Sequence, residues 1–578
     1  MNKLLTVWGE ALDRTHPLPE YPRPQLVRDS YVNLNGVWKY AFTRTAERPP
    51  RFDGEIVVPF APESILSGVE RQLQPDETLW YERTVTLPEG FVRGRVLLHF
   101  GAVDQIADVW WNGAHVTRHE GGYLPFSVDI TNQLRDGENT LAVRVTDSLL
   151  GTPHAYGKQK YKRGGIWYTA TSGIWQTVWL ESVPENYVEA LELTPDFDTR
   201  RLYWRVRAQD PRDARIAVYA DGARIAEGRS DGNGGGILTI PDETFRPWSP
   251  EDPFLYTAAV DINGGDHVES YFALRKLGTA EYRGRKVLAL NGKPYFHNGL
   301  LDQGYWSDGL YTAPSDEALV YDIQTAKSLG FNMLRKHIKV EPLRWYYHCD
   351  RLGMLVWQDL PSGGGRYDPL VVSAPLVTDA HLKDSHYALF GRADKRGREQ
   401  FLADLDATVR HLRACPCVAV WVPFNEGWGQ FDALRATERL RALDPTRLVD
   451  HASGWHDQGG GDFKSRHVYF RPVRLRHDGR RVLALTEFGG YSLPVEGHVY
   501  GKKFGYRMYR SAAEWMDDYV NLYETQILPL IAAQGLSATV YTELSDVEDE
   551  LNGLLTFDRR VCKADAARLR ALNARLRF

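Results

Sequence analysis

Two glutamates stand where apolar segments of strand length end. Glu426 follows the apolar run 418–424 after a single asparagine, and Glu487 follows the run 482–485 after a single threonine. Continuous apolar runs of this length are typical of strands buried on both faces. An unpaired polar group in an apolar setting costs about 1–3 kcal/mol, so acids at such positions need partners. Two strands that each deliver a glutamate at their carboxyl ends form a candidate catalytic pair.

The chemistry that suits this pair is the hydrolysis of a glycoside with retention of configuration. It requires two carboxyl groups about 5–5.5 Å apart, of which one attacks the anomeric carbon and the other protonates the leaving oxygen. Negative charge on Glu487 would raise the pKa of Glu426 and keep it protonated at neutral pH. Strand alternation turns Asn425 toward a sugar hydroxyl beside the anomeric carbon. Two purely structural acids are the alternative.

Strands alternating with helices from about residue 277 must position these acids. Eight strands over about 300 residues predict a (β/α)8 barrel, whose active site lies at the carboxyl ends of the strands. The expected strands are Tyr295–Leu301, Asn332–His337, Met354–Gln358, Val418–Phe424, Arg447–His451, His467–Phe470, Val482–Thr486 and Ala538–Thr542. Helices are expected after the cap Ser315 and at 342–351, 398–413, 429–442, 513–533 and 564–577. The glycine-rich insertion 361–397 is expected to wall the site.

Two β-rich regions precede the barrel. Residues 31–182 show period-2 alternation and the turn dipeptides Asn35-Gly36 and Asn112-Gly113, which predict a sandwich. Residues 183–276 form a smaller block with a hairpin at Asp221-Gly222, as in an immunoglobulin-like sandwich. The expected domains are therefore 1–182, 183–276 and 277–578.

Bulk properties exclude several classes of partner. The chain has 578 residues, a net charge of −5 and no basic region, so we expect no nucleic acid partner. No segment approaches the roughly 18 apolar residues of a membrane span, and residues 1–10 do not resemble a signal peptide. The four cysteines are interpreted as buried thiols of a cytoplasmic protein in a reducing compartment; they are Cys349, Cys415, Cys417 and Cys562.

Taken together, the motifs resemble glycoside hydrolase family 2 over nearly the whole chain. In the barrel they are Phe331–Arg335, Leu355–Asp359, Asn425-Glu426 and Thr486–Gly489. Upstream they are Asp108–Gly113, Gly121–Phe126, Gly173–Trp179, Trp248–Pro250 and Pro253–Tyr256. The resemblance implies a jelly-roll-like sugar-binding β-sandwich, an immunoglobulin-like β-sandwich and a C-terminal TIM barrel. It also implies Glu426 as acid/base and Glu487 as nucleophile. The expected mechanism needs no cofactor, and no metal ligand is assigned, while the metal content is left open.

The resemblance implies further substrate-binding residues. Arg335 would keep Glu487 ionised, and Tyr469 would donate a hydrogen bond to it. The remaining candidates are Asn425, Asp302, His337, Asp359, Trp428, Trp455, Tyr541 and Glu543. Ion pairing at the barrel mouth is the alternative for the charged members, and simple packing is the alternative for the aromatic ones.

The expected activity is the release of a terminal neutral sugar by an exo-acting β-glycosidase. The expected partner is an oligosaccharide or glycoside carrying a β-galactoside, as pyranoside or furanoside, or an arabinoside. Glucuronidases of the family hold the sugar carboxylate with an asparagine and a lysine two residues later, but here Asn552 is followed by Gly553-Leu554. The alternatives are β-mannosidase- or β-glucuronidase-type specificity, a transglycosylase, or an inactive carbohydrate-binding protein. Whether the chain forms a homo-oligomer is left open.

Overall fold

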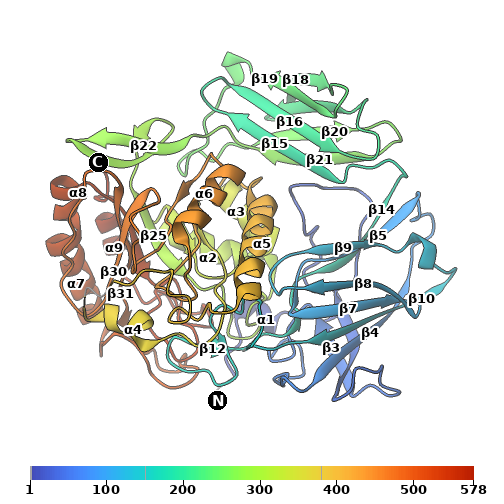
Figure 1. The fold of residues 1–578 in the computed structure, drawn as a ribbon, viewed down its shortest axis with the longest axis horizontal. Helices are drawn as coiled ribbons and strands as arrows, with labels where there is room; N and C mark the ends of the chain where they lie inside the picture. The colour runs from blue at the N-terminus through green and yellow to red at the C-terminus, as the bar shows by residue number, and fades with distance from the viewer. Residues whose placement is uncertain (1–2, 150, 379–380) are drawn as a thin grey trace.

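The computed structural model describes residues 3–149, 151–378 and 381–578. Two β-rich parts precede an α/β barrel, and both lie against it (Figure 1). A short helix, α1 (Val7–Glu10), lies near the N-terminus. The expected multidomain fold of β-sandwiches followed by a TIM barrel is confirmed. The domain boundaries stay predictions.

The first part is a sandwich of two antiparallel sheets with strand orders β3-β2-β4-β10-β7-β8 and β1-β14-β5-β9. The larger sheet contains β2 (Gly36–Thr43), β3 (Gly54–Val58), β4 (Thr78–Thr86), β7 (Ile106–Trp111), β8 (Ala114–Glu120) and β10 (Glu138–Thr146). The smaller contains β1 (Val32–Asn33), β5 (Arg95–Phe100), β9 (Phe126–Asp129) and β14 (Val178–Val183). The short pairs are β6 (Val103–Asp104) with β13 (Gly173–Ile174), and β11 (Gln159–Lys160) with β12 (Tyr168–Thr169). Trp38, Leu98 and Val143 belong to the core between the two sheets.

The two turn dipeptides of this sandwich differ in their role. Asn112-Gly113 joins the hairpin β7–β8, with φ of 52° and 83°. Asn35-Gly36 does not form a hairpin, because β1 pairs with β14 in one sheet and β2 begins the other sheet. The positive φ of Gly36, 113°, turns the chain between the sheets.

The second part is a smaller sandwich with strand orders β15-β16-β19 and β18-β17-β20-β21. Its strands are β15 (Ala190–Asp196), β16 (Arg201–Arg207), β17 (Arg215–Ala220), β18 (Ala223–Arg229), β19 (Gly235–Thr239), β20 (Tyr256–Asp261) and β21 (His267–Phe272). Leu202, Trp204 and Val206 alternate with exposed residues along β16, as period 2 predicts. A three-stranded sheet of β22 (Leu277–Tyr282), β23 (Arg285–Leu290) and β24 (Lys293–Pro294) leads into the barrel.

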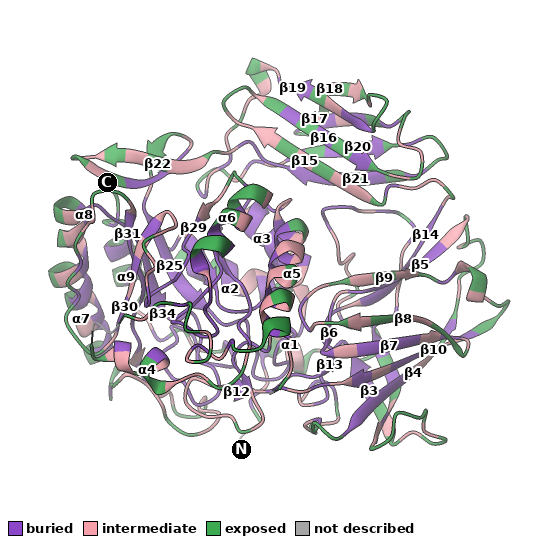
Figure 2. Ribbon diagram, viewed as in Figure 1, coloured by how far each residue is buried: buried purple, intermediate pink, exposed green. Residues whose placement is uncertain are grey.

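The third part is a nearly closed parallel barrel with the strand order β29-β28-β27-β26-β25-β34-β31-β30. Its strands are β25 (His297–Asp302), β26 (Met333–Lys336), β27 (Leu355–Asp359), β28 (Val418–Val422), β29 (Leu448–Val449), β30 (Phe463–Val468), β31 (Val482–Gly489) and β34 (Leu536–Thr542). Strands β28 and β31 are buried along their full length, as their apolar sequences predict. Figure 2 shows this buried centre beneath helices with exposed outer faces.

Helices surround the barrel, and all except the short α4 lie where the sequence predicts them, with shifts at their ends. They are α2 (Asp316–Ser328), α3 (Leu343–Leu352), α4 (Pro369–Val372), α5 (Lys395–Leu412), α6 (Ala433–Leu443), α7 (Ala512–Leu522), α8 (Leu528–Gln534) and α9 (Ala566–Asn573). The hydroxyl of Ser315 accepts a hydrogen bond from the backbone N–H of Ala318, which confirms the predicted cap. A π-helical turn, Tyr523–Ile527, joins α7 to α8. The insertion 361–397 contains the short α4.

Three of the four cysteines are buried, as expected. Cys562 is exposed, which corrects the interpretation of that thiol as buried. Within the described ranges, the structure has no helix with the length and apolar character needed to span a membrane.

Candidate active site

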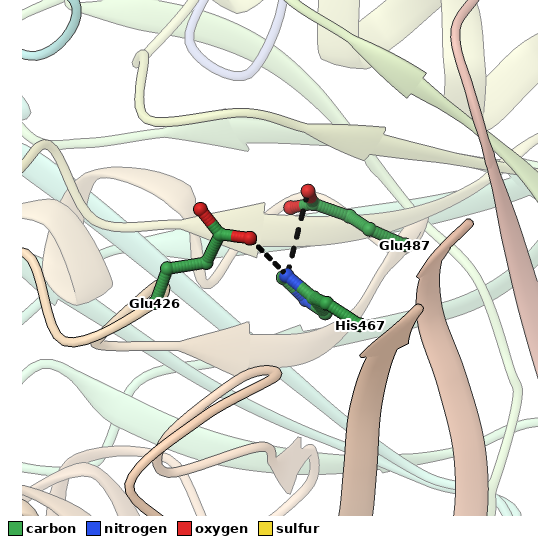
Figure 3. Close-up of side chains that lie close together, drawn as sticks. All are labelled: Glu426, His467 and Glu487. Carbon is green, nitrogen blue, oxygen red and sulfur yellow. Dashed lines mark hydrogen bonds and ion pairs between the residues drawn. The ribbon is translucent and has the colours of Figure 1, made fainter. Parts of the chain in front are cut away.

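The two candidate acids face each other at the carboxyl ends of the barrel strands (Figure 3). Glu426 lies four residues beyond β28 and Glu487 lies within β31. A carboxyl oxygen of Glu426 and one of Glu487 lie within 4.8 Å of each other, and both residues are buried. Inverting glycosidases hold their carboxyl groups about 6.5–9.5 Å apart, whereas retaining ones hold them about 5–5.5 Å apart. The separation therefore suits retention.

His467, which the sequence analysis did not identify, connects the two acids. Its Nδ1 lies 2.8 Å from Oε1 of Glu426 and 3.4 Å from Oε2 of Glu487. Its Nε2 lies 3.3 Å from a guanidinium nitrogen of Arg335, which can only donate a hydrogen bond, so Nε2 accepts. Burial lowers the pKa of His467 to about 4. The ring is therefore neutral at pH 7, and its Nδ1–H donates to Glu426.

Arg335 holds the nucleophile candidate and two neighbours in place. Its guanidinium donates two hydrogen bonds to Asp359, at 2.9 and 3.1 Å, and one to Glu487 at 3.1 Å. A further N–H donates to Oδ1 of Asn425 at 2.7 Å. Tyr469 donates from its hydroxyl to the other oxygen of Glu487 at 2.6 Å. Two donors at hydrogen-bond distance favour the ionised form of Glu487.

The surroundings of the two acids favour different protonation states. Burial raises the pKa of Glu426 to about 7, opposed by the charges of Lys158 and Arg335. Burial and the charge of Glu426 also raise the pKa of Glu487, but the charge of Arg335 and the hydrogen bond from Tyr469 oppose that rise. Glu426 is therefore the better proton donor at neutral pH, and Glu487 the better carboxylate nucleophile.

Asn425 and His337 lie beside the pair, where the sequence predicts them. The Nδ2 of Asn425 is buried and has no hydrogen-bond partner among the described residues, so it can donate to a sugar hydroxyl. The Nδ1 of His337 lies 2.9 Å from Asp359 and 4.0 Å from Glu487. Asp359 therefore contacts both Arg335 and His337 next to the catalytic pair.

Aromatic side chains surround this polar group. Trp428 packs on Trp167 of the first sandwich with ring centroids 5.1 Å apart, and it lies 6.4 Å from His337. Trp455 lies 6.1 Å from His467. Tyr469 stacks on Tyr506 at 4.1 Å. Flat rings at these positions can pack against the apolar faces of a sugar.

Two predicted substrate contacts lie on the outer side of the barrel strands, which corrects their assignment. Asp302 accepts a hydrogen bond from Lys336 at 2.7 Å, and this lysine packs over Trp345 of α3. Tyr541 packs against Tyr519 of α7 with ring centroids 4.7 Å apart. Side chains alternate along a strand, so both point toward the helices rather than into the barrel.

Glu543 lies just beyond β34, within electrostatic reach of Lys158. It accepts a hydrogen bond at 2.9 Å from Gln303, a residue that the sequence analysis did not identify, and its Oε1 has no partner among the described residues. Burial raises its pKa well above the usual range. The raised pKa favours the protonated form of Glu543, which can donate a hydrogen bond.

The site also has the ligands for a metal ion. Glu426, His467 and Glu487 each offer one ligand atom, all within 4.8 Å of one another. Two carboxylates and an imidazole suit Zn²⁺. A bound ion would occupy the carboxylate oxygens that the glycosidase chemistry needs, so the two uses exclude each other.

Comparisons with known proteins identify the family of the chain. Residues 67–184 match the family model "Glycosyl hydrolases family 2, sugar binding domain", and residues 283–470 match "Glycosyl hydrolases family 2, TIM barrel domain". The β-glucuronidase of Rattus norvegicus is 27% identical over 410 residues, covering 65% of this chain and 59% of that protein. The β-glucuronidase of Sus scrofa is 25% identical over 504 residues, covering 77% and 71%.

A solved structure extends the comparison to the fold. The β-glucuronidase of Bifidobacterium dentium complexed with coumarin-3-O-glucuronide superposes with a TM-score of 0.75 at 19% identity, over 95% of this chain and 98% of that one. This likeness concerns the fold alone. Because both family models match in order and together cover more than half of the sequence, the chain belongs to glycoside hydrolase family 2.

Proposed function

We propose that this protein is a retaining, exo-acting β-glycosidase with Glu487 as nucleophile and Glu426 as acid/base. The main support is the pair of carboxyl groups, whose oxygens lie within 4.8 Å of each other in unequal surroundings. Arg335 and Tyr469 donate hydrogen bonds to Glu487 and stabilise its carboxylate form. The pKa of Glu426, about 7, suits a group that gives up a proton and takes it back.

In the first step an oxygen of Glu487 attacks the anomeric carbon as the glycosidic bond breaks. Glu426 transfers its proton to the leaving oxygen, and the sugar becomes an ester of Glu487. The Nδ2 of Asn425 donates to the hydroxyl beside the anomeric carbon, a bond that strengthens as the transition state forms.

In the second step water displaces Glu487. Glu426, now a carboxylate, accepts a proton from the water as its oxygen attacks the anomeric carbon, and Glu487 leaves as a carboxylate. The Nδ1–H of His467 donates to Glu426 at 2.8 Å and stabilises the ionised form that this step requires.

For the sugar, we propose a β-glucuronide rather than the neutral sugar expected from the sequence. Both relatives described above are β-glucuronidases by name. A β-galactosidase of Clostridium acetobutylicum is also related, at 24% identity, but the match covers only 39% of that protein. β-Galactoside, arabinoside and β-mannoside specificities are thus the other outcomes of the test.

The test is a panel of 4-nitrophenyl β-glycosides with wild-type enzyme, Glu487→Gln and Glu426→Gln. We expect the glucuronide to have the highest kcat/KM, and each substitution to lower it more than about a hundredfold. Azide should restore turnover by Glu426→Ala, because it needs no proton to attack. Near wild-type rates in either glutamine variant would refute the mechanism, and sugar binding without turnover would indicate a binding protein.

A further inference from the structure

A loop of the first sandwich, residues 151–172, reaches the barrel and docks beside the active site. It carries β11 and β12. The hydroxyl of Tyr168 donates to Glu550 at 2.5 Å, and Thr169 donates through its backbone N–H to Glu548 at 3.1 Å. Arg163 forms an ion pair with Asp549 at 2.8 Å. Three consecutive acids of the segment after β34 thus hold the loop in place.

Lys158 of this loop extends its side chain into the active site. Its Nζ lies 5.8 Å from the ring centroid of Trp428 and 5.2 Å from that of Tyr168. Its charge lowers the pKa of Glu426 and of His337, which places it within electrostatic reach of the catalytic pair. Only 6% of the residue is exposed.

This buried ammonium lacks strong partners. Among the described residues, Nζ of Lys158 forms no ion pair within 4.0 Å, and its one hydrogen bond, to Tyr168, is 3.5 Å long. The three other buried lysines of the described residues are paired: Lys336 lies 2.7 Å from Asp302, Lys339 lies 2.9 Å from Glu341, and Lys563 lies 2.6 Å from Asp546. A buried ammonium has three N–H donors and is costly to leave unpaired. Lys158 therefore has donors and charge available for an anionic ligand.

The acids nearest to Lys158 form no direct ion pair with it among the described residues. Glu550, the nearest acid in the hydrogen-bond chain, is occupied by Tyr168 and by Nδ2 of Asn552 at 3.0 Å. Burial raises the pKa of Glu543 well above the usual range, which favours its neutral form. The chain Lys158–Tyr168–Glu550–Asn552 also brings the ammonium toward the segment where Leu554 replaces the lysine of glucuronidases.

We propose that Lys158 binds the carboxylate of a uronic acid in the sugar that this enzyme cleaves. The inference rests on the proposed function. It assigns recognition of the negatively charged sugar carboxylate to a residue of the first sandwich instead of a residue of the barrel. An ammonium–carboxylate hydrogen bond is charge-assisted and stronger than a neutral one. Discrimination between a uronide and a neutral sugar would then depend on the docked loop.

The experiment compares 4-nitrophenyl β-D-glucuronide with the β-D-glucoside, which differs only at C6. Lys158→Met should lower kcat/KM for the glucuronide by about 10- to 100-fold and that for the glucoside by less than about threefold. Lys158→Arg should keep most of the preference. Lys162→Met, an exposed residue of the same loop, removes the same charge and should change neither value.

Three results would overturn the inference. They are an equal loss on both substrates, no loss on the glucuronide, or an effect of Lys162→Met as large as that of Lys158→Met. Should Lys158→Met fail to fold, the glucuronide and its uncharged methyl ester are compared on the wild-type enzyme. We expect the free acid to be preferred at least about tenfold, and equal rates would refute a role for any cation.

Failure of the underlying function gives a different pattern. If the wild-type enzyme cleaves neutral glycosides through Glu487 but no glucuronide, the proposed sugar is wrong. The inference about Lys158 then fails as well, because the substrate carries no carboxylate. If the glucuronide is cleaved and only the selectivity of Lys158→Met is unchanged, the function stands and the inference alone fails.

Discussion

Replacing His467 tests how the site gives Glu426 the acid/base role and Glu487 the role of nucleophile. The Nδ1–H of His467 donates to Glu426 at 2.8 Å and so stabilises its carboxylate form. A hydrogen bond to a charged group contributes about 1.5–3 kcal/mol, and one pKa unit corresponds to about 1.4 kcal/mol. Losing this bond should therefore raise the pKa of Glu426 by about 1–2 units from its value near 7.

Two amide variants separate the contacts of the two ring nitrogens. In His467→Gln the side-chain amide approximates the position of Nε2 and loses the bond to Glu426, whereas in His467→Asn it approximates Nδ1 and keeps that bond. Glu426 must be protonated in the first step, so raising its pKa moves the alkaline limb of kcat/KM to higher pH. In His467→Gln that limb should move up by about 1–2 units, and in His467→Asn by less than about half a unit.

The assay is the pH dependence of kcat/KM and of kcat with a 4-nitrophenyl β-glycoside. With this good leaving group the second step limits kcat. A Glu426 with a higher pKa is protonated over a wider pH range, so it is less available to accept a proton from water in that step. We therefore expect kcat of His467→Gln to fall at pH 6–7 while kcat/KM persists to higher pH. An unchanged alkaline limb, or one that moves to lower pH, would refute the assigned tautomer and the role of His467.

Three further predictions concern the wild-type profile and two charged residues. In the wild-type enzyme kcat/KM should fall about tenfold per pH unit above about pH 7, as Glu426 loses its proton; a flat profile to pH 9 contradicts this. Arg335→Lys keeps a charge but cannot contact Asp359, Glu487 and Asn425 together, so kcat/KM should fall at least about a hundredfold; a loss below fivefold contradicts the geometry. Asp302→Asn should lower the free energy of unfolding by about 1–3 kcal/mol, measured by urea denaturation, and change kcat/KM of the folded enzyme less than threefold. A large loss of kcat/KM with an unchanged free energy of unfolding would instead indicate that Asp302 contacts the substrate.

The sequence predicts the barrel and its paired acids because the apolar runs 418–424 and 482–485 are each followed, after one residue, by a glutamate. It fails at His467 because β30 alternates buried Phe463, Ser465 and His467 with Lys464 and Arg466. That alternation gives no continuous apolar run. The predicted strand 467–470 therefore starts too late, so the histidine is treated as its beginning rather than as part of its carboxyl end.

Strand parity explains the two misplaced residues. Leu301 lies in the barrel interior, so the next residue, Asp302, points outward to Lys336. Val540 also lies in the interior, and Tyr541 after it points toward α7. Counting alternation from the interior residues would have excluded both, because side chains along a strand point to opposite faces.

Lys158 could not be predicted from local sequence. It lies in the first sandwich, almost 270 positions before Glu426, and only the docking of the loop 151–172 brings it to the barrel. No periodicity or turn signal within the loop specifies that contact, which depends on Tyr168 and Thr169 meeting the acids after β34.

Trapping the covalent intermediate tests the central claim most directly. The β-glycoside that the enzyme cleaves fastest is prepared with fluorine at C2 and a dinitrophenyl leaving group, which slows the second step more than the first. Mass spectrometry of a digest should then find the fluorinated sugar esterified to Glu487. A sugar attached to Glu426 or another residue, or a product released with inverted configuration and no adduct, would contradict the account.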